Sequence, residues 1–270
     1  MFQLPIRLRL VRLRTLASLL AVAFVLIGCA AWRTPDGPIP VKLIPAPQPG
    51  ASPLLVVVLP GRGDDLDDLA KTGMAETVQK AWPQADVLLA GATLPYYDEG
   101  RVQQRLHDEV IVPARARGYK EIWLTGASMG GMGTLLYEHA YPHDVTGIVL
   151  YAPFMGDAAT IKEIIAAGGP AHWDPGPKPA ALTADNYQLE MWRVVKSWQD
   201  PAEARRVWLV CGDSDRLLAA AQLMAPLLPA GHFVEVKGGH DWPMWDAGAA
   251  QVIPQIAAMQ YRDPNQKDPK

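Results

Sequence analysis

Short apolar runs alternate with amphipathic segments along most of the chain. Runs with the length and composition of strands occupy residues 54–59, 85–90, 121–125, 145–151, 206–210 and 233–236. Segments with helical periodicity occupy residues 65–82, 101–117, 129–141, 216–228 and 247–261. The first run, LLVVVL, has no polar position, as is usual for a strand covered on both faces. The alternation therefore predicts an α/β domain with a mostly parallel sheet and helices on both faces, and residues 41–44 are expected to add an edge strand.

One interval between two predicted strands, residues 157–200, is too long for a simple crossover. It contains Trp173, Trp192 and Trp198, and four prolines lie between residues 170 and 179. We therefore predict an inserted cap or lid at 155–204, within a domain that spans residues 54–262. The remaining residues, 263–270, are polar and are expected to form a tail.

The first 28 residues have the features of a targeting segment. Four arginines between positions 7 and 14 precede an almost wholly apolar run at 16–28. This run is too short to span a bilayer comfortably, and its flanks predict a secretory signal peptide at 1–28. Its end, LIGC, resembles the lipobox of bacterial lipoproteins. An uncleaved anchor, or a signal peptide cut near Ala30 or Ala31, is the alternative.

The lipobox resemblance implies that Cys29 carries a diacylglyceryl thioether and an N-acyl chain such as palmitate. Several acyl chains hold a protein stably on a membrane. The Pro-rich residues 29–53 would then form a semi-extended tether. We expect the protein in the bacterial cell envelope, lipid-anchored and facing the periplasm. Because Ala30 rather than Asp follows the cysteine, the outer membrane is favoured.

Charge and motifs exclude some classes of function. The formal net charge is −3, and the first 28 residues carry four arginines and no acid, so the rest carries −3 − 4 = −7. An acidic body argues against nucleic acid as the main partner. The sequence contains no HExxH, CxxC, P-loop or GxGxxG motif. No metal or organic cofactor is therefore expected.

The residues Gly126-Ala127-Ser128-Met129-Gly130 fit the pattern G-x-S-x-G between a predicted strand and a predicted helix. A serine hydroxyl is a poor nucleophile at neutral pH, so it must be aimed and deprotonated. A tight strand-to-helix turn aims it, and such a turn needs small neighbours. The helix N-terminus also offers backbone N–H groups to a negative oxygen. The alternative is a serine that only caps the helix.

The order and spacing of these motifs over residues 54–261 resemble the α/β-hydrolase family. The resemblance implies an α/β-hydrolase fold and the chain order nucleophile, acid, histidine. His240 lies in GGHDW after the last predicted strand, where this family places its histidine. Structural or surface roles are expected for the other histidines, at positions 107, 139, 143, 172 and 232.

The family's acid usually lies in G-x-x-D after the strand that precedes the histidine strand, which selects Asp215. Asp213, two residues earlier, and Asp157, after the strand at 145–151, remain alternatives. The acid would accept the ring N–H of His240 and fix its tautomer.

The resemblance also implies an oxyanion hole. Its backbone N–H donors would be those of Arg62, in the loop after the first body strand, and Met129, after the nucleophile. Pro60 stands where the family often has a histidine. The acidic run at 64–68 fits no EF-hand spacing and is expected to favour a helix start.

Together these features predict a serine hydrolase that cleaves a carboxylic ester of a small-molecule acyl substrate through Ser128, His240 and Asp215. Thioesterase, peptidase or lipase activity, or perhydrolysis, would use the same residues. A non-catalytic, membrane-tethered binding lipoprotein on the same scaffold is the hypothesis from another class.

Overall fold

The computed structural model describes residues 35, 37–50 and 53–260. The fold below is that of the compact unit that begins at Pro38. The predicted signal peptide, Cys29 and the polar tail at 263–270 lie outside the described residues and stay predictions. Within the described residues, no helix combines the length and the apolarity that a membrane crossing requires.

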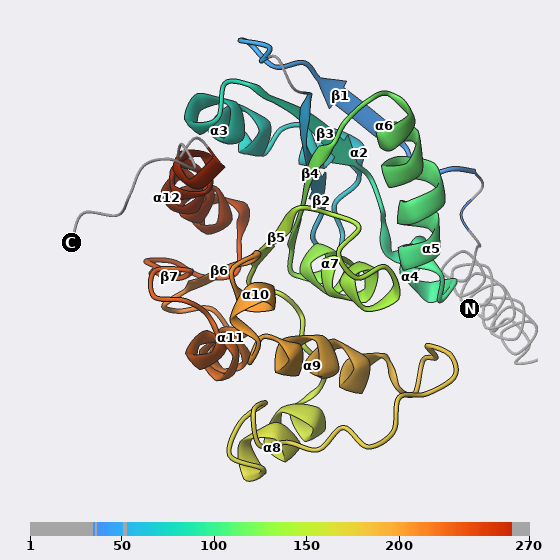
Figure 1. Cartoon of the computed structure of the whole chain (residues 1–270), viewed down its shortest axis with the longest axis vertical. Helices are drawn as coiled ribbons and strands as arrows, with labels where there is room; N and C mark the ends of the chain where they lie inside the picture. Colours follow the sequence, from blue (N-terminus) through green and yellow to red (C-terminus); the bar gives the residue numbers. More distant parts are fainter. Residues whose placement is uncertain (1–34, 36, 51–52, 261–270) are drawn as a thin grey trace, which may run out of the picture. The chain divides into compact units, whose positions relative to one another are not determined.

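A seven-stranded sheet forms the centre of the described body (Figure 1). Its strands are β1 (Val41–Ile44), β2 (Leu54–Leu59), β3 (Ala85–Ala90), β4 (Glu121–Ala127), β5 (Gly147–Tyr151), β6 (Val207–Gly212) and β7 (Phe233–Val236). Their order across the sheet is β1-β3-β2-β4-β5-β6-β7. Only the edge strand β1 runs antiparallel to its neighbour among these pairs. The predicted α/β-hydrolase fold with a mostly parallel sheet is confirmed.

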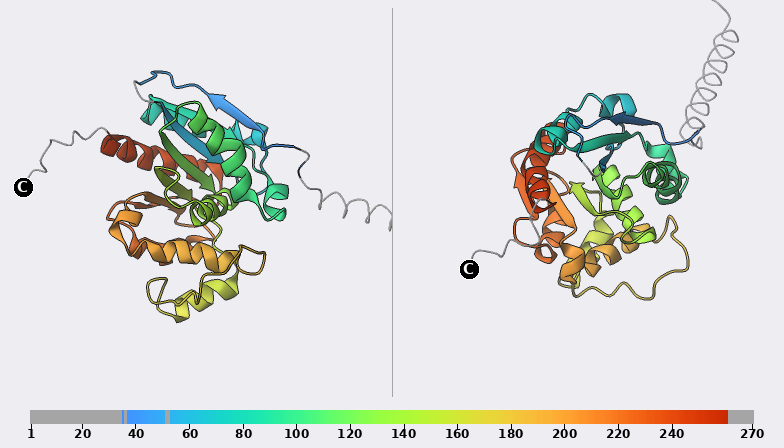
Figure 2. Two further views of the ribbon diagram at one scale, coloured as in Figure 1. Left: turned by 45° about the vertical axis from the view of Figure 1, so that its right-hand side comes forward. Right: turned by 45° about the horizontal axis from the view of Figure 1, so that its top comes forward.

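Helices cover both faces of this sheet. They are α2 (Leu66–Leu69), α3 (Met74–Ala81), α4 (Leu94–Asp98), α5 (Val102–Leu106), α6 (Val112–Ala116), α7 (Met129–Ala140), α8 (Ala158–Ala166), α9 (Tyr187–Ser197), α10 (Pro201–Ala204), α11 (Leu218–Met224) and α12 (Trp242–Gln260). A π-helical turn, η1 (His107–Ile111), joins α5 to α6, and a 3₁₀ turn, η2 (Ala225–Leu227), follows α11. Helices α3 and α12 pack together on one face, and α5 and α9 flank α7 on the other (Figures 1 and 2).

Helix boundaries differ from the sequence prediction where local chemistry overrides periodicity. The segment predicted as one helix at 65–82 is two helices, because Gly73 between them has φ +83°, a left-handed conformation that interrupts the helix. The last helix begins at Trp242, five residues before its predicted start. Asp241 accepts the backbone N–H of Met244 and so caps it, and Pro243 is tolerated in a first turn.

The predicted cap at 155–204 contains α8, α9 and α10. Helix α9 packs against α7 and buries Met191, Trp192 and Val195. The indole N–H of Trp192 donates to the Met155 carbonyl at 2.9 Å. Figure 2 shows α8 on the outer side of α9, farther from the sheet. The inner part of the segment is thus a crossover helix on the sheet face, and a lid role for α8 stays a prediction.

The loops that carry the candidate site lie at the carboxyl ends of the parallel strands. Leu59 at the end of β2 is paired with Gly126, and Ala127 at the end of β4 is paired with Tyr151. The strand order reverses between β2 and β4, and this is where open α/β sheets place their ligands. Ser128 directly follows β4 at this point.

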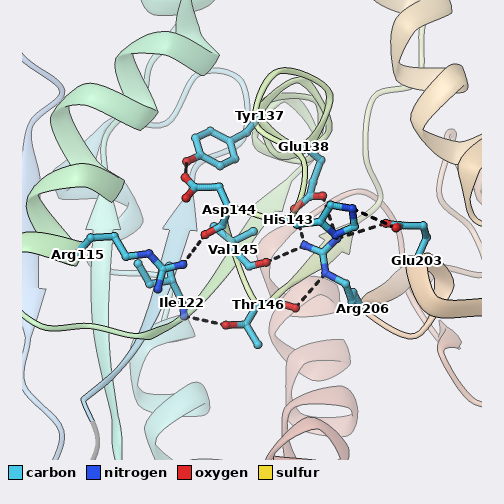
Figure 3. A network of polar contacts seen from close by, with 10 residues as sticks. All are labelled: Arg115, Ile122, Tyr137, Glu138, His143, Asp144, Val145, Thr146, Glu203 and Arg206. Carbon is cyan, nitrogen blue, oxygen red and sulfur yellow. Dashed lines mark hydrogen bonds and ion pairs between the residues drawn. The ribbon is translucent and has the colours of Figure 1, made fainter.

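Away from that edge, Arg206 joins β6 to the end of α7 (Figure 3). Its guanidinium donates to the backbone carbonyls of Thr146 at 3.2 Å and Val145 at 2.7 Å. It also donates to both oxygens of Glu138, at 3.1 and 3.3 Å. Burial raises the pKa of Glu138, and the Arg206 charge opposes that rise. The arginine therefore compensates a carboxylate that the fold has largely removed from water.

Replacing Arg206 with methionine is expected to lower the free energy of unfolding by about 3 kcal/mol, because Glu138 then loses its cation while it stays buried. The matched control is Arg205→Met, since Arg205 is exposed and next in sequence. Urea denaturation measures both variants. Equal, small losses at the two positions would contradict a stabilising role of this network.

Candidate active site

Ser128 occupies a strained turn between β4 and α7. Its backbone has φ +52° and ψ −109°, which a residue with a Cβ rarely adopts. The turn is fixed by the end of β5 and the loop after it: the Ser128 N–H donates to the Tyr151 carbonyl at 2.8 Å, and the Phe154 N–H donates to the Ser128 carbonyl at 3.0 Å. The strain is therefore held by neighbouring backbone, as in a nucleophile elbow.

The two glycines of the G-x-S-x-G pattern are required by close contacts. A Cβ on Gly126 would lie 2.2 Å from the backbone carbon of Gly130. A Cβ on Gly130 would lie 2.7 Å from the carbonyl oxygens of both Leu59 and Pro60. Both distances are too short for any side chain. The loop after β2 therefore lies directly against the first turn of α7.

His240 comes from the loop between β7 and α12 and reaches Ser128 across the sheet edge. Its Nε2 lies 2.8 Å from the Ser128 Oγ. Gly238, two residues earlier, has φ +143° and lets the loop pass close to Met244. The ring of Trp245 stands edge-on to the imidazole, with centroids 5.0 Å apart. The imidazole thus lies between the Ser128 hydroxyl and the Trp245 ring.

Asp215 completes a line of hydrogen-bonding groups. Its Oδ1 and Oδ2 lie 2.9 and 2.8 Å from His240 Nδ1, and its side chain is fully buried. The Leu217 N–H also donates to Oδ1 at 2.8 Å, which fixes the carboxylate. An ionised carboxylate only accepts hydrogen bonds, so Nδ1 carries the proton. The Nε2 lone pair is then free to accept the Ser128 hydroxyl.

The two alternative acids are used elsewhere. Asp213 accepts the Gly238 N–H at 3.0 Å, which lowers its pKa and ties the acid loop to the histidine loop. Asp157 caps α8, and its bonds from the backbone N–H groups of Thr160 and Ala159 lower its pKa. Both are exposed turn and cap residues. Of the three carboxylates, the structure brings Asp215 to the histidine.

Other histidines have packing contacts. His107 stacks on Tyr141 with centroids 4.1 Å apart, and His232 stacks on Trp208 at 3.9 Å. His232 Nδ1 also lies 2.9 Å from the Val207 carbonyl, and burial lowers its pKa. These contacts agree with the structural roles expected for them.

The predicted oxyanion donors lie on the two segments that meet at Gly130. Met129 is the first residue of α7, and the first N–H groups of a helix have no acceptor within it. Arg62 follows β2 by three residues, in the turn that the Asp64 N–H closes on the Gly61 carbonyl. Met129 directly follows Ser128, and Arg62 lies two residues after Pro60, whose carbonyl meets Gly130. The Arg62 side chain is exposed.

Cys211 carries a thiol, a second potential nucleophile, near Asp215. Its environment makes this thiol unreactive. It is fully buried at the end of β6. Burial, together with the Asp215 charge, raises the pKa of its thiol to about 12. The thiol thus stays protonated at neutral pH. In the described part of the chain, no group of three or more His, Cys, Asp or Glu side chains could hold a metal ion.

One contact at the site has no signal in the sequence. The indole N–H of Trp242 donates to Asp64 Oδ2 at 3.0 Å, although the two residues are 178 positions apart. The sequence placed Asp64 with a helix-start acidic run, but it is Asp65 that caps α2 by accepting the Asp68 N–H. No local pattern identifies a partner so distant in the chain.

Comparisons with known proteins bear on the family and the fold of the chain. A family model described as "Putative esterase" matches residues 102–255, more than half of the chain. The match includes Ser128, Asp215 and His240. No curated protein sequence matches the chain significantly.

Solved structures of low sequence identity share the fold. MPT51 from Mycobacterium tuberculosis superposes with a TM-score of 0.58 at 17% identity, over 82% of this chain and 92% of its own. S-formylglutathione hydrolase from Staphylococcus aureus gives a TM-score of 0.53 at 13% identity, over 82% of this chain and 98% of its own. Est1E from Butyrivibrio proteoclasticus gives a TM-score of 0.52 at 17% identity, over 83% of this chain and 94% of its own.

Proposed function

We propose that this chain, which belongs to the esterase family, is a serine hydrolase of the carboxylesterase type that cleaves small carboxylic esters through a Ser128–His240–Asp215 triad and an acyl-enzyme. The observation that carries the proposal is the unbroken line of short contacts from Asp215 through His240 to Ser128 Oγ. A serine that only capped α7 would not need a histidine at 2.8 Å, and Ser128 makes no side-chain cap bond.

In the first half-reaction, His240 Nε2 takes the proton of Ser128 as Oγ attacks the ester carbonyl carbon. The buried Asp215 carboxylate keeps the Nδ1–H tautomer in place and stabilises the imidazolium that forms. The imidazolium then gives its proton to the leaving alkoxide oxygen. An alcohol departs, and the acyl group remains on Ser128.

The negative oxygen of the tetrahedral intermediate would be held by the backbone N–H groups of Arg62 and Met129. Preorganised donors of this kind each contribute about 3 kcal/mol of transition-state stabilisation. The N-terminus of α7 adds a favourable dipole at the same place. The contact of Gly130 with the carbonyls of Leu59 and Pro60 supports this proposal, because it sets the two donor segments side by side.

In the second half-reaction, water occupies the position of the departed alcohol. His240 Nε2 removes its proton, the hydroxide oxygen attacks the acyl carbon, and a second tetrahedral intermediate forms at the same donors. Collapse of that intermediate breaks the bond to Ser128 Oγ, which recovers its proton from the imidazolium. A carboxylic acid leaves, and the starting state returns without any cofactor taking part in the steps.

A small-molecule ester is the proposed substrate class. Est1E, which shares the fold, has been solved with ferulic acid bound. That observation supports an acyl portion of small-molecule size for this chain as well.

Fluorophosphonate labelling tests the proposal. The chain from Pro35 onward is expected to form a covalent adduct that peptide mass spectrometry locates on Ser128, because an activated serine attacks phosphorus as it attacks a carbonyl. Hydrolysis of p-nitrophenyl acetate, butyrate and palmitate then gives the chain-length preference. If the well-folded protein does not label, the result contradicts the proposed serine hydrolase activity and favours the hypothesis of a non-catalytic binding protein.

A further inference from the structure

The loop after β2 and the start of α12 are joined beside the site, although they come from opposite ends of the body. Trp242 is the first residue of α12 and follows His240 by two positions. Its indole N–H donates to Asp64 Oδ2 at 3.0 Å. Asp64 follows Arg62 by two positions. The bond therefore links the histidine loop to the loop of one proposed oxyanion donor.

Trp245, one turn further along α12, extends the link to the imidazole. It is buried, with 4% of its surface exposed, and its ring stands edge-on to both His240 and Trp242, with centroids 5.0 Å away in each case. A Cβ on Gly61 would lie 3.6 Å from the Trp245 ring. The indole thus fills the space between the imidazole and the start of the β2 loop.

Asp64 is arranged to hold the turn that contains Arg62. Its backbone N–H closes the turn on the Gly61 carbonyl at 3.4 Å, a long bond that leaves the turn loosely fixed from within. Its side chain is not the cap of α2, which is Asp65. The Trp242 bond therefore supplies an external restraint on this turn.

We propose that the Asp64–Trp242 pair is a clamp that positions the Arg62 N–H relative to His240 and Ser128, and that both are positioning residues for ester hydrolysis. The inference rests on the proposed function. A donor stabilises an oxyanion only when it is held at hydrogen-bond distance from where the charge develops. Removing the clamp relaxes the turn, and the loss falls on the transition state rather than on the bound ester.

Four variants test the clamp with p-nitrophenyl butyrate. Asp64→Ala and Trp242→Phe each remove one partner, and Phe keeps an aromatic ring against Trp245. Asp64→Asn keeps an acceptor oxygen. Asp67→Ala is the matched control, because Asp67 is an exposed carboxylate of the same acidic run. We expect kcat to fall by about 10- to 100-fold in Asp64→Ala and Trp242→Phe, with KM nearly unchanged. In Asp64→Asn and Asp67→Ala, kcat is expected to change by less than about threefold.

Two further measurements separate positioning from general damage. The Asp64→Ala/Trp242→Phe double variant is expected to be no slower than either single variant, since one bond is lost in all three. Phenylboronic acid, which forms a tetrahedral adduct on serine, is expected to bind more weakly by the factor that kcat/KM loses. Unchanged thermal unfolding accompanies both results.

Several outcomes overturn the clamp. They are equal kcat in Asp64→Ala and Asp67→Ala, a loss confined to KM, additive losses in the double variant, or an Asp64→Asn variant as slow as Asp64→Ala. Labelling of Ser128 in the wild type is measured first. Without it the proposed function and the clamp both fail, whereas labelling together with a fully active Asp64→Ala variant rejects the clamp alone.

Discussion

Replacing Ser128 with alanine is expected to lower kcat/KM for p-nitrophenyl butyrate by about 10⁶-fold, to the residual rate that the oxyanion donors and binding alone supply. Alanine cannot form the acyl-enzyme, so the fluorophosphonate adduct and any burst of p-nitrophenol should disappear with it. Active-site titration of the wild type and steady-state assays of both proteins measure the effect.

The same variant separates chemistry from folding. Alanine keeps the Cβ of Ser128, and the positive φ is held by the backbone bonds to Tyr151 and Phe154. The free energy of unfolding should therefore change by less than about 0.5 kcal/mol, as for substitutions that lose no packing. An alanine variant that keeps a tenth of the activity would reject Ser128 as the nucleophile, whichever residue proved to replace it.

The sequence predicted the central sheet well because strands buried on both faces are recognisable locally. The all-apolar β2 and the alternation that follows are sufficient for a parallel α/β sheet. The pattern around Ser128 was also recognisable locally, although only Gly126 is required by a contact within the strand–helix unit, with Gly130, whereas Gly130 is required by the carbonyls of Leu59 and Pro60 in a distant segment. The pattern G-x-S-x-G can be read from residues 126–130 alone, whatever contacts require its glycines.

Features that depend on distant segments were harder to predict. Spacing alone left Asp213, Asp215 and Asp157 open, and the choice among them is decided by where three separate loops lie in space. The pairing of Asp64 with Trp242 joins segments 178 residues apart, and nothing near either residue marks it. The segment around α9 likewise resembles an insertion in sequence, whereas Trp192 is fully buried against the body.

Asparagine at Asp215 is expected to lower kcat by about 10⁴-fold while the fold is retained. The amide oxygen can keep the bond from the Leu217 N–H, which turns the amide N–H₂ group toward His240 Nδ1. Nδ1 must then accept, so the proton moves to Nε2. An Nε2–H group cannot take the proton of Ser128, and the base is lost through the wrong tautomer.

The same substitution at the two alternative carboxylates is the matched control. In Asp213→Asn the amide oxygen can still accept the Gly238 N–H, and in Asp157→Asn it can still cap α8, because asparagine caps helices about as well as aspartate. Both variants are expected to keep kcat within about threefold of the wild type, since neither carboxylate contacts His240 and isosteric surface changes have small effects. Steady-state kinetics of the three asparagine variants make the comparison. A loss of kcat of about 10⁴-fold in Asp213→Asn or Asp157→Asn, with kcat nearly unchanged in Asp215→Asn, would identify that other residue as the acid. It would also show that the Asp215–His240 contact does not determine the tautomer.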